Sequence, residues 1–314
     1  MISVYREFSD LKNIVKKSIV VIGNFDGVHL GHQAVLNYAK SLKKEANDNL
    51  LLLTFYPHPL KVLRPEYAPR NILSFRNKVI KMKELGVDII LAQRFNKNFS
   101  KISADNFIKI ILSQGLKARH IVVGDDFRFG NNRQGNIDYL KSQEHQNNFK
   151  VHIINEISDK KVRYSSSLAR EMIIKGKMFE AKKVLGYFHE IEGKVVKGEQ
   201  MGRKLGFPTA NIHYLNTIIP DNGIYAGWVK FNNKTYMSAI STGYRPQFKG
   251  KKRFLEAYIL NFSGDIYGTR IKVSLVEKIR KEKVFSDIDE LKKQMSLDCI
   301  EVVKILEKVK TSIL

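Results

Sequence analysis

The chain has 314 residues, of which 43% are hydrophobic, and a formal net charge of +23 at pH 7. This length exceeds one typical core, so two domains are expected, and the hydrophobic fraction is typical of a globular protein. The single cysteine, Cys299, excludes an internal disulfide and favours a reducing compartment; the charged N-terminus and the absence of a long apolar run argue against export and membrane insertion, so a cytoplasmic protein is expected.

The positive charge allows three kinds of partner: nucleic acid, an acidic membrane surface, or phosphorylated small molecules. The lysines are spread along the chain, and the densest basic cluster, residues 249–253, contains no interleaved aromatic side chains. We therefore favour a solvated lysine-rich surface whose field also helps to attract phosphate-bearing substrates. Nucleic-acid binding is kept as a minor alternative.

Apolar strands alternate with helical segments through the first half of the chain. Strands are expected at Ile19–Ile22, Leu50–Phe55, Asp88–Ala92, His120–Gly124 and Lys150–Asn155. Helices are expected at Gln33–Glu45, Arg76–Leu85, Asp105–Gln114 (with Ser103 as N-cap), Ser167–Lys175 and Phe179–Leu185. This alternation predicts an α/β domain with a Rossmann-like, doubly wound parallel sheet, in which ligands bind at the carboxyl ends of the strands.

The most informative stretch is residues 20–32, in which a β-branched strand leads into a glycine-rich turn and the start of an amphipathic helix. Free N–H groups and the positive end of the helix dipole make such a turn an anion site. His29 and His32 lie in the same turn. Their imidazoles can donate hydrogen bonds to phosphate oxygens where negative charge develops.

The spacing His-x-Gly-His after a strand resembles the signature of nucleotidyltransferases, which join a nucleoside monophosphate to an acceptor and release pyrophosphate. The longer string Gly-x-Phe-Asp-Gly-Val-His-x-Gly-His is similar to that of the FMN adenylyltransferases. This resemblance implies that His29 and His32 are catalytic, and that ATP is bound by Gly23, Phe25, Asp26 and Gly31. The alternative is two exposed turn histidines without a role.

Two other loops follow expected strands and carry residues capable of binding a flat ring. Phe127 and Phe129 could lie against such a ring and Asp126 could accept from a ring N–H, although aromatic residues beside a turn usually belong to the core. This loop matches the flavin family's motif Val-Gly-x-Asp-Phe-x-Phe-Gly. The resemblance implies a flavin site made of Pro57, His58, Asp126, Phe127 and Phe129.

Residues 163–170, Arg-Tyr-Ser-Ser-Ser-Leu-Ala-Arg, follow the fifth expected strand. The hydroxyls can cap the next helix, or they can hold a triphosphate together with Arg170. The family pattern here is Ser-Ser-Thr-x-x-Arg, so the resemblance implies that Ser166, Ser167 and Arg170 bind ATP. The following helix ends at Gly186, which divides the chain into domains of residues 1–186 and 187–314.

After Gly186 the hydrophobic period changes to that of strands without intervening helices. Strands are expected at Phe188–Val196, Ile224–Phe231, Thr235–Thr242, Phe254–Phe262 and Thr269–Ile279, with a short hairpin at Asn232-Asn233. This pattern predicts an antiparallel β-barrel. A terminal helix is expected from about Asp287, capped by Ser286, with an apolar stripe of Leu291, Met295, Ile300, Val303 and Leu306.

Residues 202–211, Gly-Arg-Lys-Leu-Gly-Phe-Pro-Thr-Ala-Asn, form the second dense motif. Two glycines around basic residues predict a flexible cationic flap, and Thr209 and Asn211 offer oxygen ligands to Mg²⁺; the alternative is a Gly-Pro-rich barrel turn. The string resembles the riboflavin kinase signature, Gly-x-x-Leu-Gly-x-Pro-Thr-Ala-Asn. The resemblance implies an ATP site of Gly202, Lys204, Gly206, Pro208, Thr209 and Asn211, the last two also holding the metal.

In the riboflavin kinase family a glutamate on a barrel strand takes the proton from the riboflavin 5′-hydroxyl, and Glu256 matches it. From the residues alone, Glu256 would be an outward-facing strand residue, because both of its neighbours are apolar. Arg280 and Phe285 match an Arg…Phe pattern, and the resemblance implies that they bind flavin. This chain has Ser241, Gln247 and Asn261 where the family tends to have Asn, Thr and Asp, which bears on the efficiency of the kinase step.

Both modules in this order, from Val20 to about Asp298, resemble the prokaryotic bifunctional riboflavin kinases/FMN adenylyltransferases. The resemblance implies that riboflavin is phosphorylated to FMN and FMN is adenylated to FAD, with ATP, riboflavin and FMN as substrates and Mg²⁺ as cofactor. One alternative is an adenylyltransferase with a weak or silent kinase barrel. The other is a basic nucleic-acid-binding protein, which leaves the phosphate motifs unexplained, so no nucleic acid or membrane partner is expected.

Overall fold

The computed structural model describes residues 2–45, 48–155, 158–159, 162–198, 200–244 and 253–311. Gln247 and residues 249–252 of the basic cluster lie outside these ranges, and so does the side chain of Lys204. The chain divides into two compact units, one made of Met1–Pro69 with Phe75–Tyr164 and the other of Arg70–Ser74 with Ser165–Leu314. The expected boundary at Gly186 lies at the end of a helix pair that the second unit contains.

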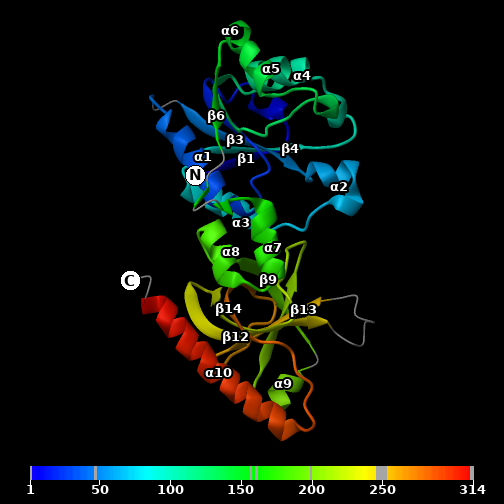
Figure 1. Ribbon diagram of the computed structural model, residues 1–314, viewed down its shortest axis with the longest axis vertical. Coiled ribbons are helices and arrows are strands. Elements are labelled where there is room, and N and C mark those ends of the chain that lie inside the picture. The colour runs from blue at the N-terminus through cyan, green and yellow to red at the C-terminus, as the bar shows by residue number, and fades with distance from the viewer. Residues whose placement is uncertain are drawn as a thin grey trace. The chain divides into compact units, whose positions relative to one another are not determined.

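The first unit is built on a parallel six-stranded sheet in the order β1-β4-β3-β2-β5-β6 (Figure 1). Its strands are β1 (Ser3–Tyr5), β2 (Ser18–Ile22), β3 (Asn49–Tyr56), β4 (Ile89–Arg94), β5 (Ala118–Gly124) and β6 (Lys150–Ile154). The predicted doubly wound sheet is confirmed, with all five predicted strands in place; the short edge strand β1 was not predicted. A small antiparallel pair, β7 (Ser158–Asp159) and β8 (Val162–Arg163), follows the sheet.

Helices cover both faces of this sheet, with α1 and α3 on one side and α4, α5 and α6 on the other (Figure 1). They are α1 (Leu30–Ser41), α2 (Pro59–Leu63), α3 (Phe75–Glu84), α4 (Ala104–Asn106), α5 (Ile137–Ser142) and α6 (Glu144–Asn147). Helix α1 starts three residues earlier than expected and ends at Ser41. The predicted helix at Asp105–Gln114 is instead α4, whose N-cap is Ser103 as predicted, followed by a π-helical stretch, η5 (Phe107–Gly115).

The sheet has a switch point between β2 and β5. From β2 the chain moves outward through β3 to β4, and it then returns to the other side of β2 to form β5 and β6. Open parallel sheets bind ligands in the crevice outside the carboxyl ends of the strands at such a point. The histidine turn follows β2 and the loop of Asp126 to Phe129 follows β5, so both predicted loops begin on either side of this switch point.

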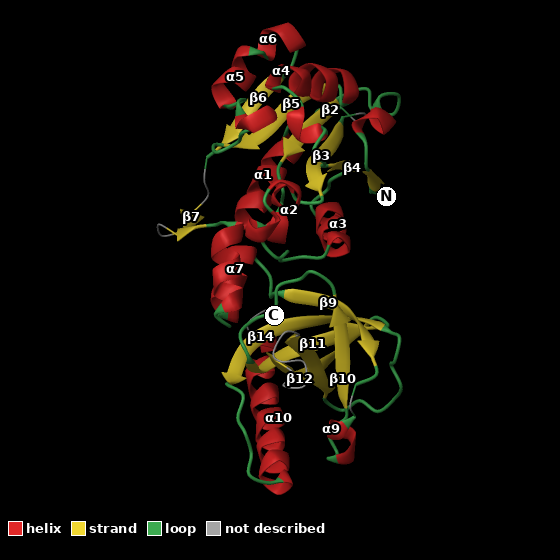
Figure 2. Ribbon diagram, turned by 90° about the vertical axis from the view of Figure 1, so that its right-hand side faces the viewer, coloured by secondary structure: helices red, strands yellow, loops and turns green. Residues whose placement is uncertain are grey.

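The second unit contains a closed antiparallel barrel in the order β10-β13-β12-β11-β14-β9 (Figure 2). Its strands are β9 (Glu190–Val196), β10 (Thr209–Tyr214), β11 (Gly223–Phe231), β12 (Lys234–Tyr244), β13 (Arg253–Ile259) and β14 (Arg270–Arg280). The predicted barrel is confirmed. Asn232 and Asn233 both have positive φ, at 47° and 60°, as a two-residue hairpin turn requires. Strand β10 was not predicted, because its sequence coincides with the second motif.

The terminal helix α10 (Ile288–Thr311) packs on β11, β12 and β14 of the barrel. Two predictions about it were wrong. The cap is Asp287, whose side chain accepts from the Glu290 N–H at 2.8 Å, while the Ser286 hydroxyl bonds to the Glu290 carboxylate. In the predicted apolar stripe Leu306 is buried, but Ile300 is 64% exposed. The buried residues of the helix are Asp298, Val302, Leu306 and Val309, so a carboxylate occupies one core-facing position.

Three segments that precede the barrel in sequence belong to its unit: helices α7 (Ser166–Ile174) and α8 (Met178–Leu185), and the segment 70–74. The backbone of Asn71 forms two hydrogen bonds with the barrel loop, donating to Asn216 O at 3.1 Å and accepting from Ile218 N at 2.9 Å. The Ser74 hydroxyl donates to Glu192 at 3.3 Å. A piece of chain from between β3 and β4 is therefore built into the second unit.

Candidate active sites

The turn after β2 holds its residues in unusual backbone conformations. Phe25, Gly27 and Val28 have φ values of 48°, 76° and 41°. Positive φ in a β-branched residue such as Val28 is strained, and strain of this kind gathers at functional sites. All residues from Phe25 to His29 are buried. The turn is therefore a fixed, desolvated cradle rather than an exposed loop, which is contrary to the alternative of two exposed histidines.

Two glycines of the predicted ATP site leave room for aromatic rings. A Cβ at Gly23 would lie 2.8 Å from the ring of Phe25, and a Cβ at Gly31 would lie 3.1 Å from the ring of His29. The ring of Phe25 lies 4.5 Å from that of His32. The glycines thus permit close packing of the three rings around the turn.

His29 and His32 stack with ring centroids 3.6 Å apart. His29 is the N-cap of α1, since its Nδ1 accepts from the His32 backbone N–H at 3.3 Å. A neutral imidazole whose Nδ1 is an acceptor carries its proton on Nε2. His29 therefore carries its ring proton on Nε2, at the N-terminus of a helix where backbone N–H groups without intrahelical partners also gather.

Burial lowers the pKa of His32 well below its ordinary value, and the nearby His29 and Lys78 lower it further. His32 is therefore a neutral imidazole at pH 7. Its Nδ1 is buried and has no hydrogen-bond partner among the described residues. A buried polar atom without a partner is costly, which is consistent with a ligand atom meeting it during function.

Lys78, on α3, also belongs to this site and was not predicted. Its Nζ donates to the carbonyl oxygen of Asn24, in the turn, at 2.7 Å. Burial lowers the pKa of its ammonium, while the Asp26 carboxylate acts in the opposite direction. Nothing in the sequence distinguishes Lys78 from the neighbouring lysines 81 and 83, because only the fold brings it to the turn.

The residues of the predicted flavin site differ in how accessible they are. His58 caps α2, its Nδ1 accepting from Leu60 N at 3.2 Å, and the adjacent Pro57 is half-buried. Asp126 is largely exposed and lies 3.9 Å from the Arg163 guanidinium. Phe127 stacks on Phe129 at 5.3 Å, and Phe129 is buried in the sheet's core. Phe127 and Asp126 are thus better placed to meet a ligand than Phe129.

Ser166, Ser167 and Arg170 lie in the first turns of α7, in the second unit. The N-cap is the preceding Ser165, which accepts from Leu168 N at 3.1 Å. Capping therefore does not use the two predicted hydroxyls, of which Ser167 is exposed. Arg170 donates through Nε to the carbonyl oxygen of Arg70 at 3.2 Å, and this bond ties α7 to the segment 70–74.

The barrel brings the predicted kinase residues together across strands. Glu256 on β13 pairs directly with Asn211 on β10 and with Ser241 on β12. Directly paired residues in antiparallel strands share one face, so the three side chains form a row. The Thr209 hydroxyl donates to Glu256 Oε2 at 3.1 Å. Leu255 and Ala257 are buried inside the barrel, which leaves Glu256 on the outer face as expected.

The side-chain oxygen atoms of Thr209, Asn211 and Glu256 are suitable ligands for a hard cation. Asn211 is 8% exposed, and a Cβ at Gly198 would lie only 2.3 Å from its amide group. Thr209, Asn211 and Glu256 supply hydroxyl, amide and carboxylate oxygens, the donors that Mg²⁺ prefers alongside water and phosphate. The residues therefore fit the metal, although the described part of the chain contains no group of three or more His, Cys, Asp or Glu suited to an ion.

The predicted flap contains a short helix, α9 (Met201–Lys204), followed by a turn. The Phe207 N–H donates to Gly202 O at 2.8 Å, and a Cβ at Gly202 would lie 2.4 Å from Phe207 O. Gly206 has a φ of 88°, a Cβ added there would meet no other atom within 4 Å, and both Gly206 and Pro208 are exposed. Gly202 thus allows the close backbone approach of a tight turn, and Gly206 lies at the open tip of that turn.

Arg280 ends β14 in a buried ion pair with Asp298 of α10. Its Nε and Nη2 donate to the two carboxylate oxygens at 2.8 and 2.7 Å, and its guanidinium lies 5.8 Å from the centre of the Phe285 ring. The side chains are 14% and 5% exposed. Arg280 and Phe285 are therefore adjacent as the resemblance implies, but Arg280 is already bound to the carboxylate of Asp298, which the sequence analysis did not identify as a site residue.

Replacing Asp298 by alanine is expected to lower the free energy of unfolding by about 3–5 kcal/mol, because it leaves a buried guanidinium uncompensated. Urea unfolding of the full chain measures the change. Glu301→Ala, which removes an exposed partner of Lys304 at 3.6 Å, is the control and is expected to cost under about 1 kcal/mol. Equal effects of the two substitutions would contradict this interpretation.

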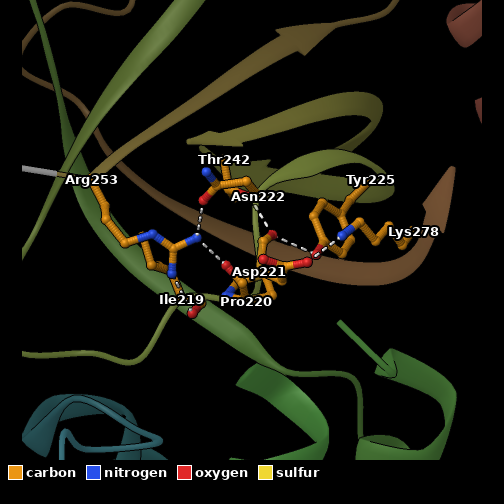
Figure 3. A network of polar contacts seen from close by, with 8 residues as sticks. All are labelled: Ile219, Pro220, Asp221, Asn222, Tyr225, Thr242, Arg253 and Lys278. Atoms are coloured by element: carbon orange, nitrogen blue, oxygen red, sulfur yellow. Dashed lines mark hydrogen bonds and ion pairs between the residues drawn. The ribbon is translucent and has the colours of Figure 1, made fainter. Parts of the chain in front are cut away.

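A polar network at one end of the barrel was also not predicted (Figure 3). Arg253, at the start of β13, donates to Ile219 O at 3.0 Å, to Pro220 O and to Asn222 Oδ1 at 2.8 Å. Three further bonds converge on Asp221, from Tyr225, Thr242 and Lys278. The network fixes the loop that continues from the residues paired with Asn71.

Two family models match the chain in the same order as the two sites. The FAD synthetase model matches residues 11–168, and the riboflavin kinase model matches residues 185–306. The first covers strands β2 to β6 of the sheet with the histidine turn, and the second covers the barrel with Glu256.

None of the helices in the described part of the chain is long and apolar enough to cross a membrane.

Curated relatives are similar along nearly the whole chain. A bifunctional riboflavin kinase/FMN adenylyltransferase from Buchnera aphidicola (subsp. Schizaphis graminum) is 42% identical, covering 95% of this chain and 97% of its own. The enzyme of that name from Escherichia coli K12 is 35% identical, covering 89% and 90%. A solved structure titled as a macrolide-efflux protein from Streptococcus pneumoniae is 30% identical, with a TM-score of 0.85 over 95% of this chain and 97% of its own.

Proposed function

The chain belongs to the family of bifunctional riboflavin kinases/FMN adenylyltransferases, and on this premise we propose which of its residues carry the two reactions. The enzyme phosphorylates riboflavin to FMN and adenylates FMN to FAD. The main observation that supports this proposal is that each unit contains one preorganised cluster suited to phosphate chemistry. These are the stacked His29 and His32 in the sheet unit and the row of Asn211 and Glu256 on the barrel. Both family models and the more similar relatives agree on the flavin reactions, whereas none of them indicates macrolide efflux.

In the kinase reaction Glu256 takes the proton of the riboflavin 5′-hydroxyl as that oxygen attacks the γ-phosphorus of ATP. Thr209 and Asn211 hold Mg²⁺, which neutralises phosphate charge when bound. The 3.1 Å bond from the Thr209 hydroxyl supports this role, since it orients the carboxylate beside the metal ligands. Gly202, Lys204, Gly206 and Pro208 hold the ATP phosphates, and Arg280 and Phe285 line the flavin.

In the adenylyl transfer the FMN phosphate attacks the α-phosphorus of ATP and pyrophosphate leaves. His29 donates from Nε2–H to the developing charge, and the neutral His32 completes the cradle formed by Gly23, Phe25, Asp26 and Gly31. Ser166, Ser167 and Arg170 hold the triphosphate, while Pro57, His58, Asp126, Phe127 and Phe129 line the flavin. We place the boundary between the functional domains at Gly186, the left-handed C-cap of α8.

The second candidate is an adenylyltransferase with a weak kinase barrel. It is favoured by one observation: Ser241, which stands where the family tends to have asparagine, is paired directly with Glu256. A shorter side chain beside the base offers one hydrogen-bonding group fewer. The lone cysteine and the need for ATP support a cytoplasmic location for either candidate.

Purified full-length protein incubated with riboflavin, ATP and Mg²⁺ is expected to accumulate FMN and then FAD, separated by chromatography. Chelation of the metal with EDTA should stop FMN formation, and excess Mg²⁺ should restore it. FAD formed from supplied FMN but not from riboflavin would favour the second candidate. Absence of both products with either substrate would contradict the proposal altogether.

A further inference from the structure

Lys78 brings a cation to the histidine turn from a different helix. It lies on α3, whereas His29 and His32 lie at the start of α1, and both helices pack against the turn at Asp26–Val28. The side chain is half-buried, and its charge is close enough to act on His32 and on Asp26. The turn is therefore approached by imidazoles from one helix and by an ammonium from another.

The ammonium of Lys78 is fixed in place but not saturated. In the described part of the chain its one hydrogen bond is that to Asn24 O, although an ammonium carries three N–H donors. Asn24 O also accepts from the Thr54 hydroxyl at 3.3 Å, so the acceptor that anchors Lys78 is itself held by β3. Two donors remain available at a half-buried site, where water competes less for them.

The backbone between Asn24 and His29 is rigid, which fixes the position of the Lys78 ammonium that is bound to it. Phe25, Gly27 and Val28 are held at positive φ, a conformation that the surroundings must enforce. The bond from Lys78 to Asn24 O holds the residue just before this strained stretch, and the His32 N–H bond to His29 holds the residue just after it. Donors fixed before the substrate arrives need no reorganisation during the reaction, which makes them effective in catalysis.

We propose that Lys78 is a further catalytic residue of the adenylyl transfer, whose ammonium binds a non-bridging oxygen of the α-phosphate of ATP as the FMN phosphate attacks. In this step a bond forms between the FMN phosphate oxygen and the α-phosphorus, and the bond to the bridging oxygen of pyrophosphate breaks. Lys78 keeps all its protons and stabilises the charge that spreads over the phosphate oxygens. The proposal rests on the proposed adenylyltransferase function.

The test compares Lys78→Met, which removes the charge at similar length, with Lys78→Arg, which retains it. Lys83→Met, an exposed lysine on the same helix, is the matched control. With FMN and ATP, Lys78→Met is expected to lower kcat by about 10- to 100-fold while the KM for ATP changes by less than about threefold, and Lys78→Arg should keep more of the rate. Lys83→Met, and riboflavin phosphorylation by every variant, should match the parent.

A second readout separates contact with phosphate from a merely structural role in holding Asn24. The two α-thio diastereomers of ATP each replace one non-bridging oxygen by sulfur. If Lys78 contacts one of these oxygens, Lys78→Met should change the ratio of rates between the diastereomers. If it only supports the turn, both rates should fall alike and the melting temperature should fall with them.

An unchanged diastereomer ratio, or a kcat within a few-fold of the parent, would overturn the proposal. Its failure can be told from failure of the proposed function. Normal FAD synthesis by Lys78→Met, alongside an inactive His32→Ala, would remove Lys78 alone from the mechanism. A parent protein that makes no FAD from FMN would remove both.

Discussion

Glu256→Gln is expected to slow riboflavin phosphorylation by about 10²–10⁴-fold, the range for loss of one acid–base group. Glutamine has nearly the same shape and its amide oxygen can still accept from the Thr209 hydroxyl, so the fold should be preserved. It cannot take a proton from the 5′-hydroxyl at neutral pH. Steady-state rates of FMN formation measure the effect, and FAD formation from supplied FMN should be unchanged.

Glu277→Gln is the matched control, because Glu277 is an exposed glutamate on barrel strand β14. Its kinase rate should equal that of the parent. Overall FAD formation from riboflavin should fall in Glu256→Gln only as far as the kinase step limits it. A kinase rate within a few-fold of the parent would remove Glu256 from the mechanism and leave it as a solvated strand residue.

His32→Ala is expected to lower FAD formation from FMN by about 10²–10³-fold, as for loss of a fixed donor to a developing oxyanion. His29→Ala would have a mixed effect, because His29 also caps α1, and loss of a cap costs about 1 kcal/mol of stability. His29→Asn keeps a good cap but removes the imidazole, so it isolates the chemical role. The rate of FAD formation at saturating FMN and ATP measures each effect.

The double variant His29→Asn/His32→Ala should cost less than the product of the single effects. The two rings stack at 3.6 Å, and the effects of substituting groups in direct contact are generally not additive. His145→Ala changes an exposed histidine on α6 of the same unit and serves as the control. FAD synthesis at parental rates in both single variants would disprove the assignment, whatever the kinase rate.

Much of the fold could be predicted because it depends on short-range sequence patterns, namely hydrophobic periodicity and turn residues. Apolar runs indicated the parallel strands, and Gly186, which has a φ of 82°, indicated the end of a helix. Strand β10 was missed because Thr209–Tyr214 has the composition of a ligand motif, and only its pairing with β9 and β13 makes it a strand. The face of α10 was misjudged because periodicity does not reveal that Asp298 is buried against Arg280.

Without the resemblance, a candidate site could be predicted only where its residues are close in sequence. The histidine turn lies within one short stretch, and the geometry of its ring stack follows from that local fold. Lys78, Arg253 and Ser241 gain their positions from contacts between distant segments: a helix against a turn, a strand end against a loop, and one strand beside another. No local pattern of charge or hydrophobicity encodes such contacts.

The pairing of Asn71 with the barrel loop has a consequence for how the protein is made. Synthesis runs from the N-terminus, so Asn71 leaves the ribosome about 145 residues before Asn216, its hydrogen-bond acceptor. Contacts so distant in sequence form late in folding, because a long loop must close first. The nascent sheet can assemble early, but the strand-to-helix connection just ahead of α3, the helix that bears Lys78, acquires its partners only when the barrel exists. If synthesis stopped inside the barrel, the sheet could therefore be folded while residues 70–74 still lacked their hydrogen-bond partners.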